Sequence, residues 1–95
     1  MKQLLLVDVD EHLTIEDCFT VEECQNATPN KAWVDWVNKH YEEDFIIIYT
    51  ARRNHLTEVT KDWLYKNKVR YHVYDNTKIP GKIVDAGAIN KTGDM

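Results

Sequence analysis

Short apolar strands alternate with amphipathic helices along this chain, and that alternation restricts its fold more than any other feature. Residues 3–8 (QLLLVD) and 45–49 (FIIIY) are almost continuously apolar and too short for helices, so we expect two buried strands. Helical spacing of apolar residues follows Thr28-Pro29, a hydroxyl cap with proline at the first helical position. We expect that helix to run through about Tyr41. A second helix is predicted near residues 57–66.

Two more strands are predicted over residues 71–74 and 82–85, and residues 11–27 form a polar loop or flap. Strands that alternate with helices favour an open, mostly parallel sheet with helices on both faces. We therefore expect a three-layer, Rossmann-like α/β fold. Ninety-five residues suffice for one domain, so residues 1–95 are expected to form a single unit.

The amino-acid composition restricts the classes of molecule that this chain is expected to bind and the compartment in which it is expected to lie. The net charge is −4, from 12 basic and 16 acidic residues, which argues against general nucleic-acid binding. The apolar run from Leu4 to Val7 is too short for a signal peptide or a membrane span. Cys18 and Cys24 are expected to be reduced thiols, so a cytoplasmic protein is predicted. No oligomeric state follows from the sequence.

Polar residues gather where the predicted strands end. They are Asp8 and Asp10 after the first strand, Thr50 after the second, Lys78 after the third and Asp85 after the fourth. Sites in such sheets lie beyond the carboxyl ends of the strands. Paired carboxylates repel one another unless a hard cation such as Mg²⁺ lies between them, and that cation also offsets the charge of a phosphate. A hydroxyl and an ammonium group suit phosphate oxygens, so Thr50 and Lys78 are candidate phosphate ligands.

Four segments carry a resemblance to a known family: LLLVDVDEHLT (4–14), IIIYTARR (46–53), NTKIP (76–80) and IVDAGAI (83–89). In this order they resemble the motifs of the haloacid dehalogenase (HAD) superfamily of phosphatases, especially small capsule-biosynthesis or sugar-phosphate phosphatases. The stretch between Asp10 and Thr28 is too short for an inserted cap domain, so the resemblance implies a Rossmann-like HAD core without a cap.

The resemblance implies a role for each matching residue. Asp8 would be the nucleophile that forms an aspartyl-phosphate, and Asp10 the acid and base. Thr50 would bind the phosphate, together with Lys78 or its near neighbour Lys82.

The remaining implied roles concern the metal and the substrate. Asp85 would bind Mg²⁺ with the Asp8 side chain and the Asp10 carbonyl, and Arg52 would contact the anionic part of the substrate. The resemblance thus implies a Mg²⁺-dependent phosphatase acting on a small phosphorylated metabolite or another accessible phosphate, such as a phosphorylated polymer end.

Two departures from the family pattern keep a second hypothesis open. Glu11-His12 replace Gly-Thr in the first motif, and Ala86 replaces the second acid of the last. Glycine adopts the unusual backbone angles of such a turn easily, whereas a glutamate adopts them only at a cost in free energy. The alternative is a weak or inactive HAD-like binding or regulatory protein. A phosphoacceptor domain of the response-regulator type is less favoured, because the acids here fall on the first and last strands.

Overall fold

The chain's structure, a computed structural model, describes residues 3–79. Its strands form one parallel sheet in the order β1-β2-β3, which confirms an α/β fold with a parallel sheet. The fourth strand predicted over residues 82–85, and Asp85 within it, lie outside the described residues. The strands are β1 (Leu4–Val7), β2 (Phe45–Tyr49) and β3 (Val73–Asp75).

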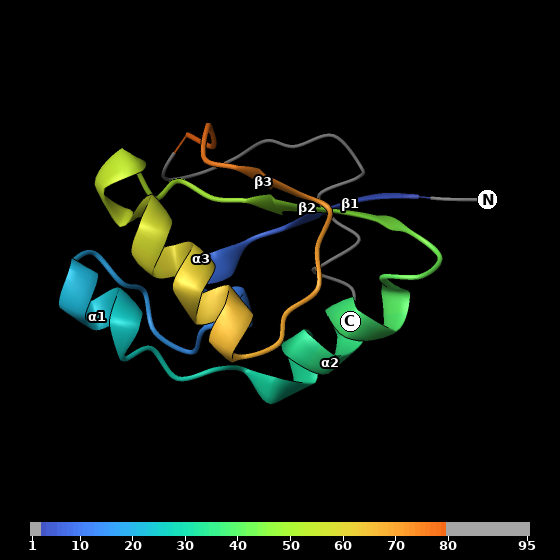
Figure 1. The fold of residues 1–95 in the computed structure, drawn as a ribbon, viewed down its shortest axis with the longest axis horizontal. Coiled ribbons are helices and arrows are strands. Elements are labelled where there is room, and N and C mark those ends of the chain that lie inside the picture. Colours follow the sequence, from blue (N-terminus) through green and yellow to red (C-terminus); the bar gives the residue numbers. More distant parts are fainter. Residues whose placement is uncertain (1–2, 80–95) are drawn as a thin grey trace.

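Three helices lie on one side of this sheet (Figure 1). They are α1 (Val21–Gln25), α2 (Lys31–His40) and α3 (Thr57–Lys66). For the described part of the chain, the prediction of helices on both faces was wrong. Both crossovers step in the same direction along the sheet, and crossovers of the same hand then place their helices on the same face. No helix within residues 3–79 has the length and apolar character needed to cross a bilayer.

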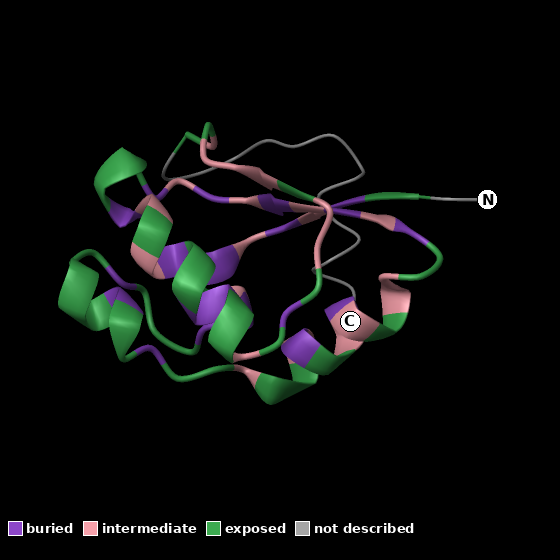
Figure 2. Cartoon of the chain, viewed as in Figure 1, coloured by how far each residue is buried: buried purple, intermediate pink, exposed green. Residues whose placement is uncertain are grey.

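Burial alternates along the strands as the helix-covered face requires (Figure 2). Leu5, Val7, Ile46 and Ile48 are all at most 1% exposed and meet the helices, whereas Leu4, on the opposite face, is 48% exposed. Neighbouring strand residues point to opposite faces, so this pattern fixes which face each residue occupies. The carboxyl ends of β1 and β2 therefore lie side by side at one edge of the sheet, directly beyond Val7 and Tyr49.

The first long helix begins later than predicted. Its N-terminal cap is Asn30, whose side chain accepts a hydrogen bond from the Trp33 N–H at 3.5 Å. The Thr28 hydroxyl instead donates to Glu16 at 2.7 Å. Pro29 pairs with Thr14 in an isolated antiparallel bridge. Tertiary pairing of residues 28 and 29 with the preceding loop overrides the local helix-start signal.

The polar segment after β1 is more ordered than predicted. It contains the short helix α1, and Thr20 and Glu23 form a capping box at its start. The Glu23 N–H donates to the Thr20 hydroxyl at 3.1 Å, and the Glu23 carboxylate accepts from the Thr20 N–H at 3.1 Å. The signal was present in the sequence as Thr-x-x-Glu, a pattern typical of helix starts.

The Asp44 side chain links the end of α2 to the sheet. Its contacts allow us to predict how the stability of the fold changes at low pH. Its carboxylate accepts the Gln3 N–H and contacts His40 Nδ1, both at 3.0 Å. The hydrogen bond from Gln3 lowers the pKa of Asp44, burial opposes that change, and His40 adds to the lowering. A carboxyl whose pKa is lowered on folding stabilises the fold above its unfolded pKa and loses that contribution as the pH falls through the folded pKa.

We therefore expect Asp44→Ala to lower the unfolding free energy by about 1–2 kcal/mol at neutral pH. The difference from the unaltered chain should shrink at a second, acidic pH below the lowered pKa of Asp44, where the wild-type carboxyl also becomes protonated. Urea unfolding at both pH values measures it. Asp35→Ala is the control, since that side chain is 65% exposed and its contact with Lys31 spans 3.8 Å. An Asp44→Ala effect that is equal at both pH values would contradict the assignment.

Candidate functional site

The turn after β1 positions the first two candidate acids. Asp8 caps the turn Val9–Leu13, and its Oδ1 accepts the Val9 N–H at 2.9 Å. Asp10 remains extended, and Glu11 adopts φ 61°, ψ 15°, the left-handed region. A glycine occupies this region at little cost, so Glu11 carries the backbone strain expected from the altered motif. The chain reverses here and brings both acids to the same edge of the sheet.

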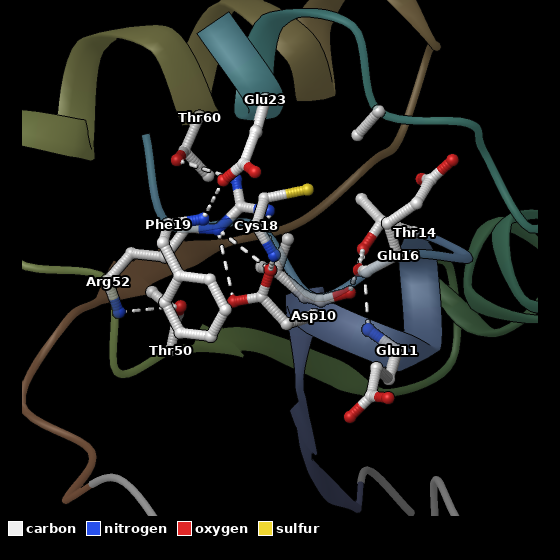
Figure 3. A network of polar contacts seen from close by, with 12 residues as sticks. Asp10, Glu11, Thr14, Glu16, Cys18, Phe19, Glu23, Thr50, Arg52 and Thr60 are labelled. Carbon is white, nitrogen blue, oxygen red and sulfur yellow. Dashed lines mark hydrogen bonds and ion pairs between the residues drawn. The ribbon is translucent and has the colours of Figure 1, made fainter. Parts of the chain in front are cut away.

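Asp10 is held by a buried arginine (Figure 3). Arg52 Nη2 donates to Asp10 Oδ1 at 2.7 Å and Nε donates to Oδ2 at 3.1 Å, while Nη1 donates to the Thr60 hydroxyl at 3.0 Å. The Cys18 N–H donates to Asp10 Oδ1 at 3.0 Å. This arrangement ties together the turn after β1, the loop before α1, the end of β2, and α3.

The ion pair changes how Asp10 and Arg52 are interpreted. The Arg52 side chain is 2% exposed and that of Asp10 19%. Burial opposes the charge of Arg52, but the hydrogen bond and negative charge of Asp10 outweigh it and raise the arginine pKa. Both residues lie at the predicted edge. Their side chains are engaged with each other inside the fold, which favours a structural role for Arg52 over the predicted contact with substrate.

Asp8 faces a lysine from the far end of the described chain. Lys78 Nζ lies 2.5 Å from Asp8 Oδ2, and the two side chains are 15% and 25% exposed. His12 Nδ1 lies 4.0 Å from the same oxygen. The structure thus brings Lys78 to the predicted edge, whereas its rival Lys82 lies beyond the described residues. Asp8 and Lys78 are both partly exposed, whereas the Arg52 side chain of the neighbouring pair is buried.

Thr50 lies beneath the site. It is fully buried, its N–H donates to the Asp75 carbonyl at 2.9 Å, and its hydroxyl accepts the Arg52 N–H at 3.1 Å. In this position it shapes the loop that follows β2. Its predicted contact with a phosphate stays a prediction.

A pocket of about 550 Å³ opens beside these residues. Its lining combines charged side chains with one exposed aromatic ring: Asp8, Asp10, Glu11, Asp17, Cys18, Phe19, Ala51, Arg52, Arg53, His55, Leu56 and Lys78. Sequence reasoning missed Asp17, Phe19 and His55 as parts of this site. Asp17 and Phe19 come from the loop before α1, whose path depends on the Asp10–Arg52 pair and on the capping box of α1, and His55 lies in the short helical turn Asn54–Leu56 before α3. A strand-end argument predicts none of these features.

Two residues that line the pocket have pKa values above their ordinary range. Burial raises the pKa of Cys18 to about 11, so this thiol stays protonated at neutral pH and is a poor nucleophile. Partial loss of solvent raises the pKa of Asp17, and the charges of Asp10 and Glu11 raise it further. The acidic side chains that line the pocket are therefore close enough to affect one another.

The residues described do not fit a metal site. Within residues 3–79, no three His, Cys, Asp or Glu side chains are grouped so as to hold an ion. Asp8 and Asp10 contact Lys78 and Arg52 instead. The prediction of a metal-binding protein is thus wrong for the described chain. Asp85 lies outside it, so Mg²⁺ as a cofactor stays a prediction, and so does the expectation that the chain is an enzyme.

Comparison with known proteins shows a fold that this chain shares with a solved structure. No protein-family description matches the chain, and no curated protein does either. Among solved structures, a chain in the structure of the Pnkp1/Rnl/Hen1 complex matches with a TM-score of 0.69 and 18% sequence identity. The match covers 85% of this chain and 30% of that one. At this identity the likeness establishes a shared fold.

These findings correct the family and function predictions. A solved structure that shares the fold is that of the Pnkp1/Rnl/Hen1 complex, and no match supports the HAD superfamily. The assignment to that superfamily, and with it the Mg²⁺-dependent phosphatase acting on a small metabolite, was wrong. The motif order on which the resemblance rested reflects polar residues at the ends of parallel strands, an arrangement that many unrelated α/β proteins share.

Proposed function

We propose that this chain binds the phosphate-bearing end of a polynucleotide strand, with the terminal phosphate beside Lys78. The observation that carries the proposal is a partly exposed lysine that lines a pocket at the carboxyl edge of the sheet. An ammonium group has three N–H donors. Asp8 accepts one of them, which leaves donors for phosphate oxygens.

Arg53 supports the position of Lys78. Its Nη1 donates to the Lys78 carbonyl and to the Ala51 carbonyl, both at 3.1 Å, and to the Asn76 carbonyl at 3.4 Å. The loop after β2 and the loop after β3 are thereby held together. Positive charge from Arg53 also lies on the wall of the pocket, where it favours an anionic ligand.

The acidic residues favour an end over an internal stretch of nucleic acid. Glu11 and Asp17 line the same pocket, and the chain as a whole carries a charge of −4. A protein that follows a nucleic-acid backbone normally offers a basic surface along several phosphates. Here Lys78 and Arg53 line a single pocket, which suits a single terminal phosphate. This agrees with the expectation that general nucleic-acid binding is absent.

The structural neighbour supports the polymer rather than a small metabolite as ligand. That neighbour is a chain of the Pnkp1/Rnl/Hen1 complex, and we take from it a polynucleotide as the class of ligand. A pocket of about 550 Å³ also has room for more than a phosphate group. The proposal therefore joins the chemistry of the pocket to the class of ligand that the neighbour suggests.

The test is a direct comparison of strand ends. A short single-stranded RNA is prepared with a terminal hydroxyl and with a terminal phosphate at either end, and binding is followed by fluorescence anisotropy. We expect the phosphorylated RNA to bind at least about tenfold more tightly, because a charge-assisted hydrogen bond contributes on the order of 1.5–3 kcal/mol. Equal affinity for hydroxyl and phosphate ends, or no binding of either, would overturn the proposal.

A further inference from the structure

We propose that Phe19 stacks on the base of the terminal nucleotide, so that the site selects single-stranded ends. This inference rests on the proposed function. Phe19 lines the same pocket as Lys78, and it is 69% exposed. An exposed phenylalanine on a surface is common by itself. Its position in the same pocket as Lys78 and Arg53 is what points to a ligand with both an anionic and a flat apolar part.

The backbone that carries this ring is held on both sides. The N–H groups of Phe19 and Thr20 both donate to Glu23 Oε1, at 2.8 and 3.1 Å. One residue earlier, the Cys18 N–H donates to Asp10 (Figure 3). The loop is therefore fixed by the capping box of α1 and by the buried ion pair. A backbone that is held in place before binding reduces the conformational freedom that the segment loses when a base stacks on the ring.

The chemistry of the ring explains a preference for single strands. Phenylalanine has no polar group, so its open face offers stacking and dispersion without a preference for one base. A base inside a duplex is already stacked and paired, and exposing it costs a few kcal/mol. The negative charge of Glu11 and Asp17 at the same pocket also repels the second strand of a duplex. The terminal nucleotide of a single strand does not have to leave a duplex, and it brings no second strand to the pocket.

The experiment separates the base from the phosphate. Three phosphorylated probes are compared: a single-stranded RNA, the same RNA with an abasic terminal nucleotide, and a blunt duplex. Each is titrated against the unaltered chain, Phe19→Ala, Phe19→Tyr and the control Val21→Ala. Val21 is 48% exposed in the same segment and is not part of the pocket lining. The hydroxyl-ended RNA serves as the reference for phosphate recognition.

We expect Phe19→Ala to weaken binding of the single-stranded RNA by about tenfold or more, as loss of one base–aromatic stack does. Phe19→Tyr should retain the affinity of the unaltered chain for the single-stranded RNA, and Val21→Ala should leave that affinity unchanged. The abasic probe and the duplex should bind weakly and respond little to Phe19→Ala. If the unaltered chain prefers phosphate ends but Phe19→Ala binds every probe as before, this inference fails and the proposed function stands. If no preference for phosphate ends exists, the proposed function fails first.

Discussion

Replacing Asp10 with alanine should destabilise the fold by about 3–5 kcal/mol, because it leaves a buried guanidinium without its partner. Arg52 is 2% exposed at its side chain, and Asp10 accepts hydrogen bonds from two of its nitrogens. The variant also removes the acceptor of the Cys18 N–H, so the loop before α1 should loosen at the same time. The unfolding free energy from urea denaturation, with hydrogen exchange at Cys18, measures both effects.

The size of this effect depends on the unpaired charge rather than on the loss of one attraction. Replacing both partners with apolar residues, as in Asp10→Leu with Arg52→Met, should recover much of the stability lost by Asp10→Ala. Glu42→Ala is the matched control. It breaks an exposed ion pair with Arg70 at 2.6 Å, and we expect a change below about 1 kcal/mol. An Asp10→Ala effect as small as that of the control would show that the buried pair contributes little.

Lys78→Met should abolish most of the preference for a phosphorylated strand end. The substitution keeps the apolar stem and removes the ammonium group, so the loss is expected to be about 10- to 100-fold in affinity for the phosphorylated RNA, with little change for the hydroxyl-ended RNA. Stability should change less, because Asp8 remains 25% exposed to solvent and Lys78 lies at a partly open position. Anisotropy titrations of both RNAs measure the difference.

Asp8→Asn should act in the opposite direction. It removes the carboxylate that competes for the Lys78 ammonium, so binding of the phosphorylated RNA should be unchanged or tighter. The pair of variants separates the roles of two residues in contact at 2.5 Å. Weaker binding in Asp8→Asn would mean that Asp8 itself is needed for the ligand, and unchanged binding in Lys78→Met would place the phosphate elsewhere.

The sequence predicted the framework of the fold because each element carries its own local pattern. The apolar run of β2 and the helical spacing of α3 are local properties, and the predicted bounds of α3 agree with the observed Thr57–Lys66. The start of α2 was misplaced because Thr28 and Pro29 pair with the loop after β1 instead. Contacts between distant segments of the chain decide such boundaries, and local patterns do not contain them.

The candidate site also combines features that local sequence patterns predict with features that depend on contacts between distant residues. The rule that sites lie beyond the carboxyl ends of parallel strands pointed to Asp8 and Lys78, which meet across a separation of 70 residues. It could not predict that Arg52 would turn inward, because an arginine beside a predicted pocket usually faces solvent or ligand. Its burial depends on Asp10 and Thr60 both being within reach of one guanidinium. The position of Phe19 depends in turn on that pair and on Glu23.

The most direct measurement is amide chemical-shift mapping of the unaltered chain with phosphorylated single-stranded RNA. We expect the largest shifts on Val9 to Glu11, on Ala51 to Arg53 and on Lys78, with Phe19 ring protons shifting as a base stacks. Hydroxyl-ended RNA should produce smaller shifts at the same residues. Shifts confined to the opposite edge of the sheet, or identical maps for the two RNAs, would contradict a phosphate-end site at the carboxyl ends of the strands.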